Sequence, residues 1–436
     1  MKILVYVRKF SRELFENIVN EVFPEDEKLY FSDFKHVGDI WAGTYIYNKS
    51  FDNRNPELDK QMEDIVCRDR SLRKMDKERR ERLVTRYWNG IDALFRQENF
   101  EELFTHSVDC YGIDILIRIA NKYKVHVISF TGSFIGGYSW FHQRGERHPL
   151  DRNVSQEEAK KVLNKLIQKR YLPPSEHKNV KRTAIDIYLF FYRRKLVENI
   201  YYPLRKILEQ DPDNYHYNMF NWKGEKLRDY YNNDYEKYFL HVNEIDSIDE
   251  DTVYFPLHYI PEDTTDYWNE NIPKITYHEY VYRIIKKSNP KIKFLIKEHP
   301  AMYGKRKIEF YRKISKFPNV IIIHPLDASN DLLEKVQNVL VDNGTVGVEA
   351  LLRGKRVISL SENYYSDLHP NITVVNELEI EHMHTPLVEY DNLIFMQNLL
   401  DGLFKTNFVN NKHPGDSQTA HQIAKGVKVL LVKEKS

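Results

Sequence analysis

The sequence predicts an α/β protein with two Rossmann-type domains facing a cleft. Its 436 residues are enough for two domains that each bury a core. In the second half of the chain, short β-branched runs alternate with helix-like segments; the runs are Ile292–Ile296, Asn319–Ile323, Val339–Val341 and Arg356–Leu360. Strands separated by helices indicate βαβ units, and therefore parallel sheets covered on both faces.

The same patterns predict where the domains begin and end. A strand at residues 2–7 and a helix at Ser11–Val22 open an N-terminal α/β domain, assigned to residues 1–245, on the acceptor side of the cleft. We expect a helical insertion within it at about 155–240. The second domain occupies residues 246–410, and residues 411–436 form a C-terminal helix.

Composition excludes several classes of protein. The formal net charge is +1, which gives no general attraction to nucleic acid or to an anionic membrane. Two cysteines, Cys67 and Cys110, fit a reducing compartment better than a disulfide framework. No apolar run approaches the roughly 20 residues of a spanning helix. We therefore expect a cytoplasmic protein with no nucleic-acid partner.

The helical insertion carries apolar residues at helical spacing between Ile185 and Leu208. Such a stripe is more often part of a core than a membrane-binding face, and we predict that it is buried. The Tyr-rich segment 215–238 suits an interdomain insertion, and a peripheral contact with the inner face of the membrane stays open there.

The strand end after Val341 carries a glycine-rich turn. Gly344 and Gly347 allow a tight turn and a close approach to a ligand, and Asn343 or Thr345 would cap the following helix, whose start suits a phosphate. Glu349 would bind a pair of sugar hydroxyls. The alternative is an ordinary strand-to-helix turn in which Glu349 favours the helix dipole. Neither a GxGxxG fingerprint nor a P-loop is present.

A second strand end carries Lys297, His299 and Pro300. Ligands bind parallel sheets where strands end, and Lys297 and His299 would donate hydrogen bonds to a phosphate or nucleobase. His-Pro is not itself informative, because it occurs five times. The alternative is a loop histidine that the proline makes rigid.

The first domain offers two further candidates. Arg68 and Arg70 flank Asp69, and the arginines would hold an acidic sugar or a leaving phosphate. Gly137 and Tyr138 follow the strand at Val125–Phe130 and would admit an acceptor sugar. The alternatives are a solvated charged helix and a locally packed loop.

A proline-stiffened loop follows the strand at Val253–Pro256. It carries His258 and Glu262, which we expect to face the cleft between the domains.

The KEHP stretch, a following PNV strand and NGTVGVEALLRGKRVI resemble the bacterial capsule polysaccharide biosynthesis family, which includes Kdo transferases. The resemblance covers roughly Thr252–Leu360. It implies a GT-B-like fold whose C-terminal helix crosses back to the first domain. It also implies transfer of a CMP-activated acidic sugar, of the Kdo or nonulosonic acid type, to a surface-polysaccharide or glycolipid acceptor. The turn departs from the family pattern, since Asn343-Gly344-Thr345 replaces a Gln-Ser type sequence.

With this resemblance, the nucleotide would lie on the Gly344 turn and its leaving charge would be neutralised by Lys297 and His299. Asp69, Glu262 and His299 are then the candidate catalytic residues, and neither a metal nor a cofactor is required. Two alternatives stay open. One is a UDP-sugar 2-epimerase, which the N-terminus KILVYVRKF disfavours because it lacks a Gly-Thr-Arg-Pro turn. The other is a non-catalytic scaffold with a GT-B-like fold.

Overall fold

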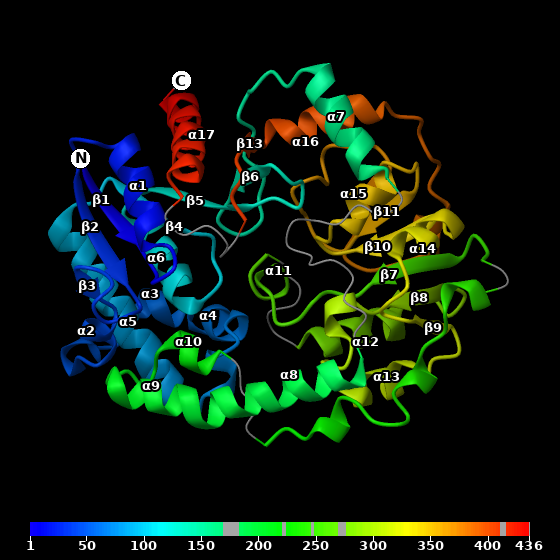
Figure 1. The fold of residues 1–436 in the computed structure, drawn as a ribbon, viewed down its shortest axis with the longest axis horizontal. Helices are drawn as coiled ribbons and strands as arrows, with labels where there is room; N and C mark the ends of the chain where they lie inside the picture. The colour runs from blue at the N-terminus through cyan, green and yellow to red at the C-terminus, as the bar shows by residue number, and fades with distance from the viewer. Residues whose placement is uncertain (169–182, 220–223, 246–247, 269–275, 410–415, 436) are drawn as a thin grey trace.

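The computed structural model describes residues 1–168, 183–219, 224–245, 248–268, 276–409 and 416–435 (Figure 1). Within these residues the strands form two sheets. One has seven strands in the order β13-β6-β5-β4-β1-β2-β3, and the other has six in the order β12-β11-β10-β7-β8-β9. The predicted α/β class with two Rossmann-type domains is confirmed.

The first sheet is centred on β1 (Lys2–Tyr6), which pairs in parallel with both β2 (Glu27–Ser32) and β4 (Glu102–His106). β3 (Ile40–Trp41) and β5 (His126–Gly132) extend it in parallel, and β6 (Tyr138–Phe141) is antiparallel. Side chains of β1 alternate between the two faces of the sheet. Leu4 and Tyr6 pack under α5 (Lys77–Glu98) and α6 (Tyr111–Lys122), whereas Ile3 and Val5 pack against α1 (Arg12–Val22).

The second sheet is entirely parallel. Its strands are β7 (Thr252–Pro256), β8 (Lys293–Lys297), β9 (Val320–Ile323), β10 (Asn338–Val341), β11 (Arg356–Ser359) and β12 (Ile372–Val374). One face packs on α12 (Tyr277–Lys287) and α13 (Ile308–Ile314). The other packs on α14 (Ser329–Lys335), α15 (Val346–Leu351) and α16 (Asn392–Asp401). The four strands predicted between residues 292 and 360 therefore form, each shifted by at most one residue.

Short helices and turns connect these elements. They are α2 (Gly43–Ile46), η1 (Lys49–Phe51), α3 (Pro56–Asp59), α4 (Met62–Arg68), η2 (Leu72–Lys74), α10 (Tyr215–Asn218), η4 (Leu227–Asp229), η5 (Glu236–Tyr238), η6 (Val242–Glu244), α11 (Asp263–Asp266), η7 (Pro300–Met302) and η8 (Ile380–His384).

The chain returns to the first domain earlier than the predicted boundary at residue 411. β13 (Leu403–Lys405) pairs antiparallel with β6, and α17 (Ser417–Lys435) packs against α1 through the same core. A Cβ on Gly426 would lie 2.6 Å from the ring of Phe404, so α17 lies directly on β13. A three-residue strand is too short for a periodic pattern to reveal it.

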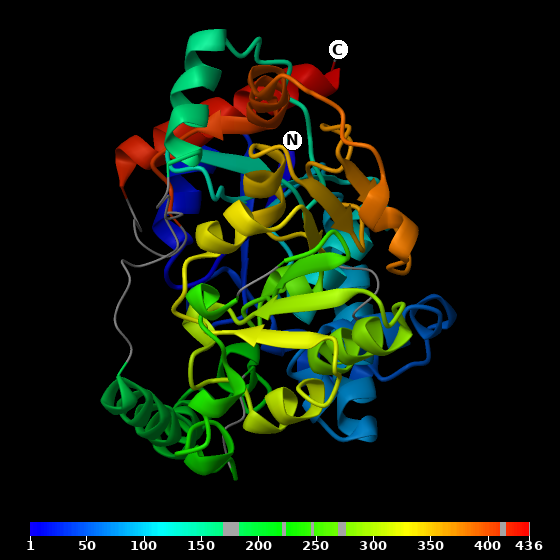
Figure 2. The ribbon, with the colours of Figure 1, turned by 90° about the vertical axis from the view of Figure 1, so that its right-hand side faces the viewer.

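The helical insertion contacts both domains rather than the first alone. α7 (Gln156–Leu166) packs on α16 at one end of the molecule. α8 (Ala184–Leu196), the π-helical turn η3 (Val197–Tyr201) and α9 (Tyr202–Leu208) form a continuous helix at the opposite end (Figures 1 and 2). The prediction that its apolar stripe is buried is wrong, because ten large apolar side chains between Ile185 and Leu208 are 46–73% exposed.

Candidate functional site

In each sheet, the chain adds strands first on one side of a central strand and then on the other. The central strands, β1 and β7, are the points where this direction reverses, and they locate the candidate site. In the first sheet β2 and β3 lie on one side of β1 while β4 and β5 lie on the other. In the second sheet β8 and β9 lie on one side of β7 while β10, β11 and β12 lie on the other. Open parallel sheets bind ligands at the carboxyl ends of the strands beside such a reversal. The candidate positions are therefore the ends of β1 and β4, and the ends of β7 and β10.

At the reversal of the second sheet, His258 follows β7 and Gly344 follows β10. A Cβ on Gly344 would lie 3.7 Å from His258 Cε1 and, among the described residues other than its two chain neighbours, would meet no other heavy atom within 4 Å. His258 Nε2 is 3.7 Å from Asp342 Oδ2, and Asp342 Oδ1 accepts a 2.5 Å hydrogen bond from the Tyr280 hydroxyl. The structure thus brings together two predicted binding residues from strands that the sequence separates by more than 80 positions.

His258 is uncharged at neutral pH. Burial, reinforced by the nearby Arg306 guanidinium, lowers the pKa of His258 to about 4. A neutral imidazole offers one donor and one acceptor, so His258 can hydrogen-bond a nucleobase or a phosphate but does not neutralise a charge.

Lys297 does not face a ligand as predicted. It is 2% exposed, and its Nζ donates to the backbone carbonyls of Glu298 and Pro325, each at 3.2 Å. Glu298 itself forms a fully buried ion pair with Arg306, at 2.5 Å between Nε and Oε2. This junction therefore holds the loop after β8 in place, which corrects the predicted role of Lys297.

His299 and Pro300 begin a 3₁₀ turn. His299 Nδ1 accepts the backbone N–H of Ala301 at 3.1 Å, and Pro300 is the first residue of η7. The imidazole is half-buried, with its ring centroid 5.8 Å from that of Tyr259. His299 thus lies on the loop after β8, the strand next to β7, and beside the loop that carries His258.

The two glycines of the turn after β10 have different roles. A Cβ on Gly347 would lie 2.1 Å from the Tyr365 hydroxyl, which itself donates to the backbone carbonyl of Gly344 at 2.8 Å. Gly347 is therefore required by packing, whereas Gly344 is open. Thr345 makes no side-chain cap to α15, which has six residues.

Glu349 lies on α15 and is half-buried. Burial raises the pKa of Tyr364, and the negative charge of Glu349 raises it further. Its carboxylate is therefore close to an aromatic side chain of the loop after β11.

At the reversal of the first sheet, Arg8 follows β1 and Asp109 follows β4. They form a bidentate ion pair, with Nη1–Oδ2 at 2.6 Å and Nη2–Oδ1 at 2.7 Å. Burial alone would raise the pKa of Asp109, but the Arg8 guanidinium holds it well below its usual range. Asp33, after β2, accepts hydrogen bonds from the Tyr6 hydroxyl and from His216 Nε2, the latter at 3.3 Å.

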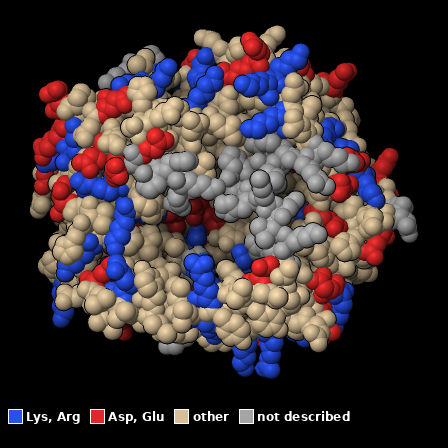
Figure 3. Space-filling view, viewed as in Figure 1, with Lys and Arg blue, Asp and Glu red and all other residues tan. Residues whose placement is uncertain are grey.

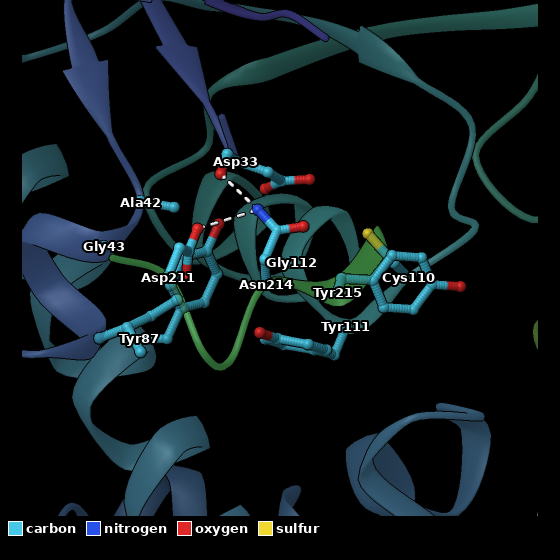
Figure 4. A pocket seen from close by; sticks show the side chains of 11 residues that line it. Asp33, Ala42, Gly43, Tyr87, Cys110, Tyr111, Gly112, Asp211, Asn214 and Tyr215 are labelled. Atoms are coloured by element: carbon cyan, nitrogen blue, oxygen red, sulfur yellow. Dashed lines mark hydrogen bonds between the residues drawn. The ribbon is translucent and has the colours of Figure 1, made fainter. Parts of the chain in front are cut away.

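A pocket lies next to this pair (Figure 4). Asn214 reaches into it and donates from Nδ2 to the backbone carbonyl of Asp33 and to Asp211 Oδ2, each at 2.9 Å. The lining also includes Tyr87, Cys110 and Tyr111. The sequence analysis missed this group, although polar residues just after the strands ending at Ser32 and His106 were the available signal.

α11 brings the second domain against the first (Figure 1). Arg70 donates from Nη2 to Asp263 Oδ1 at 2.9 Å, and its Nε lies 2.8 Å from Asp266 Oδ2. Arg73 also pairs with Asp266, at 2.8 Å, and Asn343 donates to the backbone carbonyl of Thr264 at 2.8 Å. The space-filling view shows a hollow between the two halves with Asp and Glu atoms inside it (Figure 3). Arg70 therefore lies between the domains as predicted, but it is paired with acids of the same chain.

Asp69 is a structural anchor rather than a base. It is completely buried, and its Oδ1 accepts the backbone N–H groups of Ser71 and Leu72 at 2.7 and 2.9 Å. Oδ2 accepts the backbone N–H of Tyr111 at 2.9 Å and the Tyr267 hydroxyl at 3.0 Å. The Ser71 hydroxyl also donates to Oδ1, at 2.5 Å. Five donors therefore occupy the carboxylate, which argues against the catalytic role predicted for it.

Arg68 is also engaged within the protein. Its Nε is 2.8 Å from Asp64 Oδ1, and its Nη1 donates to the backbone carbonyl of Tyr267 at 3.2 Å. It therefore joins the two domains, and its predicted contact with a ligand stays a prediction.

Asp263 lies at the interface between the domains, where its surroundings raise the pKa of its carboxyl. Burial, together with the negative charge of Asp109, outweighs the pairing with Arg70 and raises the pKa of Asp263 to about 7. Burial also raises the pKa of the neighbouring Glu262, whose Oε2 accepts the Thr264 hydroxyl at 2.9 Å. A carboxyl that titrates near neutral pH in a cleft is a candidate for proton transfer.

Gly137 and Tyr138 lie at the start of β6 and contact neighbouring elements of the protein. The Tyr138 hydroxyl donates to Glu158 at 2.9 Å and the side chain is 8% exposed. Gly137, at φ 93°, accepts the backbone N–H of Thr406. The predicted stacking of an acceptor sugar on Tyr138 is therefore wrong, because α7 and β13 cover this turn.

Among the described residues, one group of side chains could ligate a metal: His241, His324 and Asp327, whose ligand atoms lie within 4.8 Å of one another. His241 Nδ1 is already paired with Asp327 at 2.9 Å, and His324 Nε2 with Glu236 at 3.2 Å. The group lies at the end of β9, the edge strand of the second sheet. It is separate from the reversal beside β7.

Fold and site together define an α/β protein with two Rossmann-type domains, one with a mainly parallel sheet and one with an entirely parallel sheet, which meet at α11. Residues 276–406 match the family model described as "Capsule polysaccharide biosynthesis protein". This span runs from the start of α12 to β13, and the match confirms the family resemblance predicted from the sequence.

No curated protein sequence matches the chain. Among solved structures, it is similar to the Thermosulfurimonas dismutans KpsC beta Kdo 2,7 transferase, with 12% identity, 99% of each chain covered and a TM-score of 0.37. It is also similar to the UDP-GlcNAc 2-epimerase of Methanocaldococcus jannaschii, with 16% identity, coverage of 98% and 99%, and a TM-score of 0.24. These TM-scores are too low for either likeness to bear on the chemistry.

Proposed function

We propose that the protein is a glycosyltransferase of capsule polysaccharide biosynthesis. It moves a sugar from a nucleotide donor to a glycan or glycolipid acceptor on the cytoplasmic side of the membrane. The observation that carries the proposal is α11, which places Asp263 between the reversal points of the two sheets. The donor proposed is a CMP-activated acidic sugar of the Kdo or nonulosonic acid type, as the family resemblance implies.

The nucleotide would bind at the reversal of the second sheet. Gly344 leaves open space beside His258, and the neutral imidazole supplies a hydrogen-bond donor for a phosphate or nucleobase. Thr345, His299 and Glu349 are candidates for the rim of this site. Asn343 ties the turn to α11, so nucleotide binding and the position of Asp263 would be linked.

The acid–base step would use Asp263. In the transfer, the bond from the anomeric carbon to the nucleotide phosphate oxygen breaks, and a bond to the acceptor hydroxyl oxygen forms. The hydroxyl proton passes to the Asp263 carboxylate, and Glu262 lies next to it. Hydrogen-bond donors and side-chain charges stabilise the leaving phosphate in this scheme, which requires no metal or cofactor.

A thermal-shift panel of CMP, CDP, UDP and GDP tests the donor. We expect CMP to raise the melting temperature of the protein, because a ligand that binds only the folded state stabilises it. Stabilisation by UDP but not CMP would contradict the acidic-sugar donor, and no stabilisation by any nucleotide would favour a scaffold. Interconversion of UDP-GlcNAc in the absence of an acceptor would instead identify an epimerase.

Two histidine variants test the position of the nucleotide. His258→Ala should weaken CMP binding at least about tenfold, because one lost hydrogen bond to a charged group is worth about 1.5–3 kcal/mol. His324→Ala, at the end of the edge strand β9, should leave the affinity unchanged. Isothermal titration calorimetry measures both, and equal losses would remove the basis for placing the nucleotide beside β7.

A further inference from the structure

The continuous helix α8–η3–α9 exposes an apolar face that nothing in the described residues covers. Of 21 exposed large apolar side chains in the described residues, ten lie in these 25 residues. They are Ile185, Tyr188, Leu189, Tyr192, Leu196, Ile200, Tyr201, Leu204, Ile207 and Leu208. Concentration of this kind marks an interaction surface, whereas single exposed apolar residues do not.

The helix is apolar on two opposite sides. Ile187 and Phe191 are both 4% exposed, and a Cβ on Gly304 would lie 2.6 Å from Ile187 Cδ1. At 3.6 residues per turn, the exposed apolar residues of α8 fall within an arc of about 100° on the side opposite Ile187. The second domain covers the inner apolar face, so the outer apolar face is suited to an apolar environment of its own.

The π-helical turn keeps the exposed apolar residues on one side of the helix. Tyr188, Tyr192, Leu196, Ile200, Leu204 and Leu208 recur at intervals of four residues. A four-residue spacing exceeds the α-helical period and would make the row drift around the helix. The wider turn at Val197–Tyr201 rotates less per residue and opposes the drift. The row therefore extends along the whole helix, which at 1.5 Å per residue is roughly 37 Å long.

The charges beside this face are mainly basic. From Thr183 to Gln210 the sequence has five Lys and Arg against three Asp and Glu. In α8, Arg193 and Lys195 fall on opposite flanks of the exposed apolar arc. At the lower edge of Figure 3, where this helix runs, the surface is largely uncharged, with Lys and Arg side chains projecting from it.

We propose that α8–η3–α9 is an amphipathic helix that lies in the plane of an anionic membrane surface, with Leu189, Leu196 and Leu204 inserted. Tyr side chains favour the boundary between lipid and water. Basic flanks beside an apolar face are the features of helices that lie in the membrane interface. A convex row on one helix offers no groove for a peptide partner, and the net positive charge complements anionic lipid headgroups. No helix in the described part of the chain is long and apolar enough to cross a membrane, so the contact is peripheral.

Vesicle sedimentation with the full chain tests this proposal without nucleotide, and so separately from the proposed transfer reaction. The protein should sediment with vesicles of phosphatidylcholine containing about one quarter phosphatidylglycerol, and less with phosphatidylcholine alone. Leu189→Ser/Leu196→Ser/Leu204→Ser should reduce binding at least about tenfold. Val388→Ser/Ile394→Ser/Val432→Ser, which changes three apolar residues exposed elsewhere, should bind like the wild type.

A second variant keeps the test independent of folding. Arg193→Ala/Lys195→Ala retains the apolar row and should lower binding to the anionic vesicles by about fivefold for each charge removed. Failure of the wild type to sediment, or equal binding by the Leu and Val/Ile triple variants, would overturn the proposal. A lipid-free dimer that becomes monomeric in the Leu variant would also overturn it, because a second copy would then cover the face.

Discussion

Acidic residues of similar appearance in the sequence differ in what surrounds their oxygens. Asp69 is buried and accepts five hydrogen bonds, so its carboxylate holds a loop in place. Asp109 is held ionised by the bidentate Arg8. Asp263 and Asp266 both pair with Arg70, and burial raises the pKa of Asp263 to about 7. The surroundings thus shift the pKa of Asp109 and that of Asp263 in opposite directions.

Replacing Asp263 tests this assignment. In the wild type, kcat/KM should rise with pH through an apparent pKa near 7, because a base must be deprotonated to accept the acceptor proton. Asp263→Asn should lower kcat at least about 100-fold and remove this pH dependence. Asp266→Asn removes a negative charge that raises the pKa of Asp263, so it should keep the pH dependence but move it to lower pH. An unchanged profile in the Asp263 variant would assign the titration to another group.

At the scale of elements, the turn between β10 and α15 combines a packing requirement with open space. The Tyr365 hydroxyl occupies the position that a side chain on Gly347 would take, and it bonds the carbonyl of Gly344. Tyr365, in the loop after β11, therefore holds the turn on one side. On the other side, Gly344 faces His258. This division explains why two glycines three residues apart serve different purposes.

Alanine substitutions separate the two glycines. Gly347→Ala should destabilise the protein by about 1–3 kcal/mol through overpacking, and Tyr365→Phe in the same chain should recover part of the loss by removing the clashing oxygen. Gly344→Ala should fold with a near-normal melting temperature but bind CMP more weakly. Thermal melts and calorimetry measure these effects. Equal destabilisation by both alanines would show that the space beside Gly344 is not available to a ligand.

At the scale of the whole molecule, aromatic residues from both domains meet beside α11. His142 lies between Trp140 of the first domain and Trp268 of the second, with ring centroids 4.2 and 4.7 Å away. His142 is 1% exposed, its Nδ1 accepts the N–H of Gly145, and burial lowers its pKa to about 3. The contact between the domains thus depends on a neutral imidazole.

Acid should therefore destabilise the assembled molecule. The folded pKa of His142 lies below its unfolded value of about 6.5, so the unfolded state binds the proton more readily. The contribution of His142 to stability is fully present above pH 6.5 and decreases as the pH falls toward 3. Melting temperatures between pH 7 and pH 4 should fall less steeply for His142→Gln. His148→Gln, at a half-exposed position, should match the wild type, and identical slopes for all three would assign the effect to other groups.

The strands and their order along the chain were largely predictable. The runs at 292–296, 319–323, 339–341 and 356–360 are β-branched and separated by amphipathic segments, so local pattern was sufficient. β13 was not predictable, because three residues carry no period. The burial of the stripe at 185–208 was wrongly predicted, since helical spacing of apolar residues does not reveal whether another element covers them.

The sequence by itself determined the α/β class and the resemblance to the capsule polysaccharide biosynthesis family, and it singled out His258 and Gly344 as candidate binding residues. Those features depend on local periodicity, glycine geometry and strand ends. The tertiary structure decided which charged residues are occupied by partners, because ion pairs such as Arg70–Asp263 and Glu298–Arg306 join residues from different loops. It also decided that the apolar helix faces outward, because burial is a property of neighbours that lie far away along the chain.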